Sequence, residues 1–312
     1  MNENRLYVFF GYRTEYTLNP LYEYMKGKGY HCVEITPVKC HDMRKALLEL
    51  SAEEYVFITS AHVFLDETYY QGKKSHTYLS VLEAMDILQP VKSVHYPHDL
   101  VTLVHEFDEP WLNSIFDVIL FPVDGYAHLS CHGKPIYNVG WIKKHGKLGM
   151  GEKFKVGHGI GDLSYYKNFG PEYFYKTFKI VWEQGVVVKM GSLGKEKKFM
   201  SYLKKKNVKY ISGSKSIFEL IDSCEIMLTN SLTSVNMESA LSGRFTINML
   251  DGISDRRTHE KCFKGLPNLK IMSIRDTAEL LREYYRGNFV PPVGEDVLKP
   301  FDFELAVKLI TE

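Results

Sequence analysis

Short apolar runs alternate with helical stretches along this chain, and no other feature of the sequence restricts its fold so strongly. Runs such as Leu6–Phe10, Tyr55–Thr59 and Val118–Phe121 are short and continuously apolar, which is typical of strands buried on both faces. Segments with helical spacing, Asn19–Lys28 and Leu79–Leu88, lie between them. Strands separated by helices need crossover connections, so the sequence predicts an α/β fold with parallel sheets.

The alternation is interrupted once, at the glycine- and lysine-rich stretch Gly146–Gly151, and restarts with the short strand Phe154–Val156. A chain of 312 residues is too long for one ordinary core and suits two domains of about 150 residues each. We therefore expect two Rossmann-like parallel-sheet domains that face each other across a cleft. The first would span residues 1–148, and the second residues 149–312 with the final helices. The pattern also allows the last helix, Phe303–Ile310, to cross back to the first domain.

Charge and cysteine content exclude several classes of protein. The formal net charge is +1, so no overall field attracts a polyanion, and the case for a nucleic-acid partner is weak. The five cysteines are scattered and odd in number, which favours reduced thiols in a cytoplasmic protein over a disulfide framework. No apolar run reaches about 18 residues, so we expect no transmembrane segment. Peripheral attachment to a membrane stays open.

The stretch Thr229–Glu238 follows a predicted strand, Ile226–Leu228, and opens a predicted helix, Val235–Leu241. Hydroxyl groups and free N–H groups at a helix start form an anion site, which the helix dipole reinforces. A carboxylate one turn into the helix can accept both hydroxyls of a ribose. The alternative is a plain N-cap, since Ser and Thr are preferred there. The candidate donor-binding residues of this stretch are Ser231, Thr233, Ser234 and Glu238.

A glycine-rich stretch, Gly157-His158-Gly159-Ile160-Gly161, follows the strand that opens the second half. We interpret it as a loop whose backbone approaches a phosphate at Gly159 and Gly161, with His158 as a hydrogen-bond donor. The spacing differs from the dinucleotide-binding fingerprint, so it predicts no nicotinamide cofactor. Lys189 ends the VVVK strand and can neutralise phosphate charge. A flexible turn between domains is the competing interpretation.

The segment His95-Tyr96-Pro97-His98-Asp99 follows the strand Val91–Val94 and can supply a general base with an orienting partner. His98 is the first candidate, with Asp99 as its helper or substitute and His95 beside them. The alternative is a partly buried histidine pair, with Asp99 capping the next helix. Further candidates are the acceptor-side residues Arg13 and Glu15, which follow the first strand, and, as substitute bases, Glu15 and Asp162.

No Asp-x-Asp pair occurs, so we expect no bound metal and no cofactor beyond the substrate itself.

The stretch SIFELIDSCEIMLTNSLTSVNMESALSGRFTINML resembles the late C-terminal segment of GT-B glycosyltransferases and their relatives. It is similar to the matching segments of CDP-glycerol glycerophosphotransferases and UDP-N-acetylglucosamine 2-epimerases. The stretch FDVILFPVDGYAHL…KPIYNVGW resembles the end of the family's N-terminal domain. The specific match covers about 50 residues, and the rest agrees in topology only. The resemblance implies that Ser231, Thr233 and Ser234 contact a donor diphosphate and that Glu238 contacts the ribose.

This resemblance implies an enzyme that moves a sugar from a nucleotide-diphosphate donor, with UDP favoured, to an unidentified acceptor hydroxyl without a metal. Two differences from the sequences of the other relatives weaken the case for an epimerase or a glycerophosphotransferase. Where the epimerases carry His-Arg-Arg-Glu-Asn, this chain has GHGIGDLSYY, and the Trp-His-Gly segment of the polymerising glycerophosphotransferases is missing. The alternatives are, in order, transfer of a polyol phosphate from a CDP donor, 2-epimerisation of a UDP-sugar, and non-catalytic binding of a nucleotide sugar.

Overall fold

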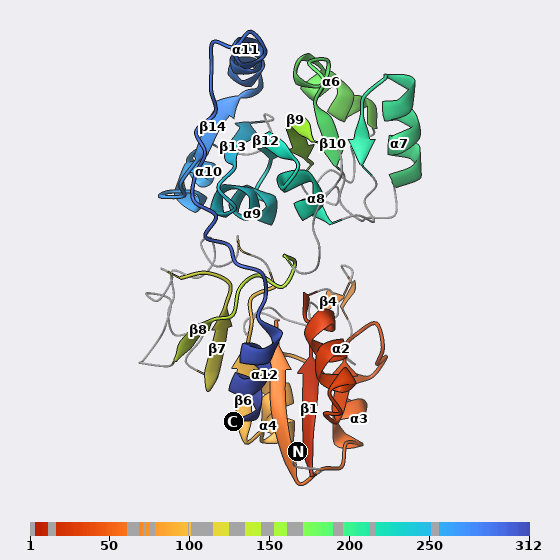
Figure 1. The fold of residues 1–312 in the computed structure, drawn as a ribbon. Coiled ribbons are helices and arrows are strands. Elements are labelled where there is room, and N and C mark those ends of the chain that lie inside the picture. Colours follow the sequence, from red (N-terminus) through yellow and green to blue (C-terminus); the bar gives the residue numbers. More distant parts are fainter. Residues whose placement is uncertain are drawn as a thin grey trace. The chain divides into compact units, whose positions relative to one another are not determined.

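The chain folds into two compact units, Met1–His145 with Lys299–Glu312, and Gly146–Leu298 (Figure 1). In this computed structural model, the described residues are 4–11, 17–60, 69–70, 73–74, 79–98, 100, 115–124, 135–144, 153–160, 171–189, 196–211, 216–250 and 256–312. Among them, no helix combines the length and the hydropathy needed to cross a membrane.

The first unit is built on a six-stranded parallel sheet, as the sequence predicts. Its strands, in spatial order, are β2 (Cys32–Ile35), β1 (Arg5–Phe10), β3 (Glu54–Thr59), β6 (Lys92–His95), β7 (Val118–Phe121) and β8 (Ile136–Asn138). Its helices are α2 (Asn19–Gly27), α3 (Met43–Leu48), α4 (Val81–Leu88) and α12 (Phe303–Thr311). A small antiparallel pair, β4 (Tyr69–Tyr70) and β5 (Lys73–Lys74), is separate from the sheet. Strands β1 and β3 are buried along most of their length because helices cover them.

The second unit is also a six-stranded parallel sheet. Its strands, in spatial order, are β11 (Tyr210–Ile211), β10 (Val187–Lys189), β9 (Phe154–Gly159), β12 (Cys224–Asn230), β13 (Phe245–Leu250) and β14 (Leu269–Ser273). Its helices are α6 (Pro171–Trp182), α7 (Glu196–Lys205), α8 (Ile217–Ile221), α9 (Ser234–Leu241), α10 (Arg256–Cys262) and α11 (Ile274–Tyr285). Counted along this unit, the spatial order is 3-2-1-4-5-6, the order of the dinucleotide-binding Rossmann fold.

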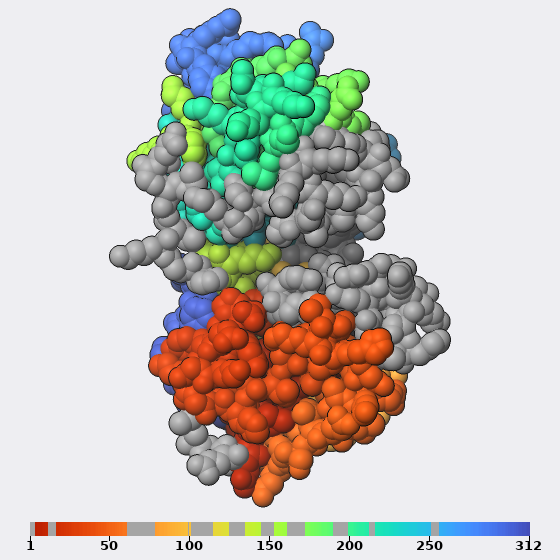
Figure 2. Space-filling model, turned by 90° about the vertical axis from the view of Figure 1, so that its right-hand side faces the viewer, coloured from red at the N-terminus to blue at the C-terminus, as the bar shows by residue number. Residues whose placement is uncertain are grey.

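Helices cover both faces of the second sheet. α6 and α11 pack together on one face, where Phe178 and Trp182 enter a core that also holds Ile226 and Ile247. α8 and α9 pack on the other face (Figure 1). α7, which is green in Figure 2, buries Phe199 and Leu203. Its last turn carries Lys204 and Lys205, both exposed.

The last helix belongs to the first unit, which corrects the expected second-domain boundary of 149–312 and agrees with the crossing back that the pattern allowed. α12 buries Ala306, Val307 and Ile310, and it packs near α2 and β7. Two long basic side chains hold its end: Arg5 Nη1 donates to the Thr311 carbonyl at 3.0 Å, and Lys92 Nζ donates to the Leu309 carbonyl at 2.7 Å. The pattern of one helix contains no information on which sheet its apolar face will cover, so only packing decides this.

Candidate functional site

The strand order of the second unit reverses between β9 and β12. The chain leaves the carboxyl end of β9 toward β10 on one side and leaves the carboxyl end of β12 toward β13 on the other, so these two connections diverge. Ligands of open parallel sheets bind at this point. The register pairs Gly159 with Thr229 on one side and with Lys189 on the other. The structure therefore brings Gly159, Lys189 and the turn after β12 to the same edge of the sheet.

The turn after β12 is shorter than the sequence suggests, because the strand continues through Thr229 and Asn230. α9 begins at Ser234, and Thr233 is its N-cap, with its side chain accepting from the Val235 N–H at 3.5 Å. The interpretation of Thr233 as an N-cap is thus correct. Its hydroxyl lies at the start of α9. Ser231 has a left-handed backbone with φ of 58°. Such a φ is uncommon for a residue with a side chain and costs conformational energy.

Glu238 is the fifth residue of α9, and its side chain is almost fully buried at 2% relative exposure. The first turn of α9 holds no acidic residue. Interaction with the helix dipole falls off beyond the first turn, so it does not account for a carboxylate at this depth. Burial of a charged group requires compensating partners, which distinguishes Glu238 from a solvated surface residue.

The glycine-rich stretch is not the expected loop, at least through Gly159, because β9 runs from Phe154 to Gly159. A Cβ on Gly157 would lie 2.8 Å from Leu220 Cδ1, and one on Gly159 would lie 3.0 Å from Val235 Cγ1. These glycines let α8 and the first turn of α9 approach the sheet closely. Their absent side chains thus serve helix packing, and the backbone of Gly157–Gly159 belongs to the ladder. Gly161 and Asp162 lie outside the described residues.

We expect Gly157→Ala to lower the free energy of unfolding by about 1–3 kcal/mol, the usual cost of adding a methyl group to a filled core. Urea unfolding measures the change. Gly27→Ala is the matched control, because a Cβ there meets nothing within 4 Å and Ala favours a helix over Gly. Equal stability of the Gly157→Ala variant and the unmodified protein would show that the close packing against Leu220 is not needed.

His158 is completely buried, and both of its ring nitrogens are engaged. Trp182 Nε1 donates to His158 Nδ1 at 2.8 Å, so that nitrogen carries no proton. His158 Nε2 therefore carries the proton and donates to Asn230 Oδ1 at 3.0 Å. The ring is a neutral bridge between α6 and the end of β12, and both of its nitrogens bond to protein side chains. Lys189 is also buried, at 4% relative exposure.

A buried polar network under the turn was missed by the sequence interpretation. It joins the side chains of Thr229, Asn236, Asn248 and His259, all with zero relative exposure. Thr229 Oγ1 donates to Asn236 Oδ1, and His259 Nδ1 bonds to Asn248 Oδ1. The sequence held a signal for this network. Asn is disfavoured inside strands and helices unless its side chain bonds to nearby groups, and Asn236 and Asn248 lie inside a helix and a strand.

In the first unit, His95 and His98 lie at the carboxyl end of β6, the edge where ligands of parallel sheets bind. His95 is half-buried, with its ring 4.9 Å from that of Phe116 between centroids. His98 is 6% exposed, and its carbonyl accepts from Thr17 Oγ1 at 3.4 Å. Asp99, Arg13 and Glu15 lie outside the described residues, so the predicted pairing of His98 with Asp99 stays a prediction.

Tyr96, between the two histidines, is a structural anchor. Its hydroxyl donates to the Gly140 carbonyl and accepts from the Ile142 N–H, both at 2.9 Å. We expect Tyr96→Phe to lower the free energy of unfolding by about 1–3 kcal/mol, because two buried backbone groups lose their partner. Urea unfolding again gives the measurement, with Tyr137→Phe as the control on an exposed tyrosine of β8. Equal midpoints and slopes for the two variants would argue against this anchor.

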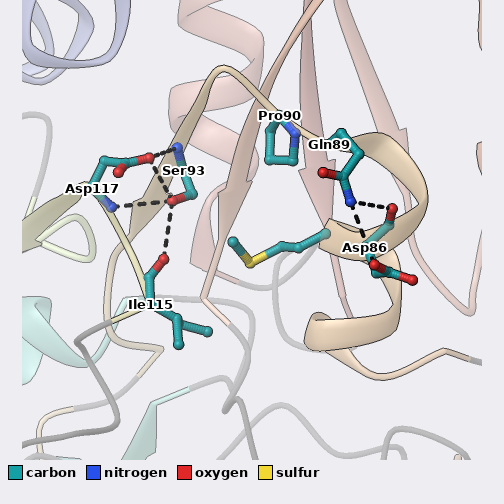
Figure 3. Close-up of a pocket in the computed structure, with 7 residues that line it drawn as sticks. Asp86, Gln89, Pro90, Ser93, Ile115 and Asp117 are labelled. Carbon is teal, nitrogen blue, oxygen red and sulfur yellow. Dashed lines mark hydrogen bonds between the residues drawn. The ribbon is translucent and has the colours of Figure 1, made fainter.

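A pocket in the first unit lies at the opposite edge of its sheet. It has a volume of about 390 Å³ and is lined by Met85, Asp86, Gln89, Pro90, Ser93, Ile115 and Asp117 (Figure 3). Ser93 is the second residue of β6 and Asp117 precedes β7, and the Asp117 carboxylate accepts from both the Ser93 N–H and hydroxyl. The pocket is thus at the amino ends of the strands, so it does not coincide with the candidate histidines.

Two solved structures are similar to this chain over nearly its whole length. The co-structure of MnaA with UDP from S. aureus is similar at a TM-score of 0.55 and 12% identity, covering 98% of this chain and 96% of that one. MurG from Acinetobacter baumannii is similar at a TM-score of 0.52 and 8% identity, covering 98% and 99%. The chain has the GT-B fold. No protein-family model and no curated protein sequence matches it. At these identities the likeness defines the fold alone, and the two Rossmann-like units predicted from the sequence are confirmed.

Proposed function

We propose that this GT-B chain is a glycosyltransferase that binds a nucleotide-diphosphate sugar, with UDP favoured, at the carboxyl ends of β9 and β12. The observation that carries the proposal is the 3-2-1-4-5-6 strand order, whose reversal point coincides with the turn 231–233 and the start of α9. The free N–H groups of a helix start and its dipole stabilise a diphosphate. MnaA, which shares the fold, was solved with UDP.

The chemistry then divides between the units. In the second unit, the N–H groups and hydroxyls at Ser231, Thr233 and Ser234 stabilise the charge that develops on the leaving diphosphate, with Lys189 as a positive neighbour. Glu238 accepts the ribose hydroxyls. In the first unit, His98 accepts the proton of the acceptor hydroxyl as the glycosidic bond forms, with Asp99 or His95 orienting it. The transfer conserves atoms: the anomeric carbon exchanges a diphosphate oxygen for the acceptor oxygen.

The test is protection of the protein by nucleotides. Thermal unfolding with UDP, CDP and dTDP should show the largest rise in Tm with UDP, because a ligand that binds only the native state stabilises it. Release of UDP from UDP-sugars in the presence of polyol or sugar acceptors then measures transfer. A larger rise with CDP would favour a polyol-phosphate transferase, and binding without any turnover would favour a non-catalytic protein. No protection by any of the three would refute the site.

We expect chelation of divalent cations by EDTA to leave the rate of sugar transfer within about twofold. An enzyme that holds its donor through a cation needs clustered carboxylates, and this sequence has no Asp-x-Asp pair. Stabilisation of the diphosphate then comes from the helix start and from Lys189. The assay is UDP release with and without EDTA, with added Mg²⁺ as the return control. Loss of activity on chelation and recovery with Mg²⁺ would contradict metal independence.

A further inference from the structure

Two buried amides hold the backbone of Ser231 in its left-handed conformation. We call the side chains of Asn236 and Asn248 the amide clamp. Asn236 Nδ2 donates to the Ser231 carbonyl at 3.1 Å, and Asn248 Nδ2 donates to the same oxygen at 3.0 Å. A carbonyl oxygen has two lone pairs, so both are taken. The left-handed conformation is unfavourable for serine. The two hydrogen bonds to the Ser231 carbonyl stabilise it.

Further hydrogen bonds fix the two side chains of the clamp. Asn236 Oδ1 accepts from Asn248 Nδ2 at 2.7 Å and from the Thr229 hydroxyl. Asn248 Oδ1 bonds to His259 Nδ1 on α10, so that ring nitrogen must carry the proton. These bonds also decide the orientation of both amides, because each nitrogen faces acceptors only. The clamp therefore joins β12, α9, β13 and α10 beneath a single turn.

The clamp fixes the direction of two backbone N–H groups. The C=O and N–H of a trans peptide unit point in opposite directions. Since the Ser231 carbonyl points at the buried amides, the N–H of Leu232 points away from them. Asn236 Nδ2 also donates to the Thr233 carbonyl at 2.9 Å, so the Ser234 N–H is likewise aimed outward, where the first N–H groups of a helix have no intrahelical partner. Paired outward N–H groups make an anion-binding concavity.

We propose that Asn236 and Asn248 are positioning residues, which preset the N–H groups of Leu232 and Ser234 for the diphosphate of the donor. This inference rests on the proposed function and assigns the diphosphate to backbone groups that the clamp orients. Preorganised donors do not have to reorient when charge appears, which is what makes such sites effective. The clamp residues are fully buried and touch the ligand only through the turn they hold.

A double-mutant cycle tests the clamp. Asn248→Ala removes one donor from the Ser231 carbonyl, and we expect it to weaken UDP binding about tenfold or more, as expected for a lost buried hydrogen bond. Glycine adopts the left-handed conformation without strain, so in the Ser231→Gly background the same change should cost at most about threefold. Calorimetric titration with UDP gives the four affinities. The hydroxyl lost in Ser231→Gly cancels from the cycle. If Asn248→Ala weakens UDP binding by the same factor in both backgrounds, the proposal is overturned.

Thr229→Val is the matched control, because it cuts the same network but leaves both bonds to the Ser231 carbonyl. Its effect on UDP binding should be the same in the Ser231 and Ser231→Gly backgrounds. A coupling as large as that of Asn248→Ala would mean that the network acts only through general stability, and would count against the clamp.

Hydrogen exchange of the unliganded protein separates the clamp from the proposed function. Amides of residues 229–241 should exchange about tenfold faster in Asn248→Ala, and a smaller increase is expected in Thr229→Val. If Asn248→Ala does not fold, Asn248→Asp keeps the acceptor for His259, loses the donors, and should show the same increase. Unchanged exchange overturns the clamp even if UDP binds. If the unmodified protein binds no nucleoside diphosphate, the proposed function fails, and exchange alone decides the clamp.

Discussion

Replacement of His98 by Gln should reduce sugar transfer by about 10²–10⁴-fold while leaving UDP affinity unchanged, the usual scale for a lost general base. An imidazole accepts and releases protons near neutral pH, which an amide cannot do. His98 lies at the carboxyl end of β6, and the donor residues lie in the other unit, so the substitution should not affect nucleotide binding. Steady-state rates of UDP release and UDP titration by calorimetry measure the two effects.

The control for His98 is His41→Gln, which removes an exposed imidazole from the same unit. Because His98 is buried, urea unfolding must accompany the kinetics, so that a loss of folded protein is not counted as a loss of catalysis. Near-normal turnover in a folded His98→Gln variant would move the base to another group. The next candidates are Asp99, Glu15 and Asp162, in separate Ala variants.

Glu238→Ala should weaken nucleotide binding by about 1–3 kcal/mol, roughly a factor of 5 to 150 in Kd, as charge-assisted hydrogen bonds to a ribose are lost. The side chain is buried in α9 just beyond the turn that we assign to the diphosphate. Truncation also removes packing, so Glu238→Gln, which keeps the shape, belongs in the same series. Calorimetric titration with UDP and CDP gives the affinities.

Glu225→Ala is the matched control, since it removes an equal charge from an exposed position at the amino end of β12, where Glu225 accepts from the Tyr284 hydroxyl. We expect no change in Kd for this variant. Unchanged affinity of Glu238→Ala and Glu238→Gln for both nucleotides would exclude the carboxylate from the site and leave it a structural role in α9.

The limits of the sequence interpretation are clearest at the glycine-rich stretch. Alternating glycines after a short apolar run predict a loop, because glycine weakens strands and loosens backbone. In the structure, Gly157 and Gly159 stay in β9 because the neighbouring strands supply its hydrogen bonds and α8 and α9 need the space. The same pattern predicts that His158 donates to a phosphate, but its ring nitrogens bond to Trp182 and Asn230, residues that are distant in sequence.

The sequence alone determined the α/β class, the two halves and the presence of a turn between β12 and the next helix, because short apolar runs and helical spacing are local properties. Tertiary structure alone decided three things: the packing of α12 on the first unit, the inclusion of Gly157–Gly159 in a strand, and the meeting of Asn236, Asn248 and His259 under one turn. Each depends on contacts between segments far apart in the chain. The local sequence pattern indicates that an apolar or polar side chain needs a partner, but only the packing of the whole chain determines which partner it contacts.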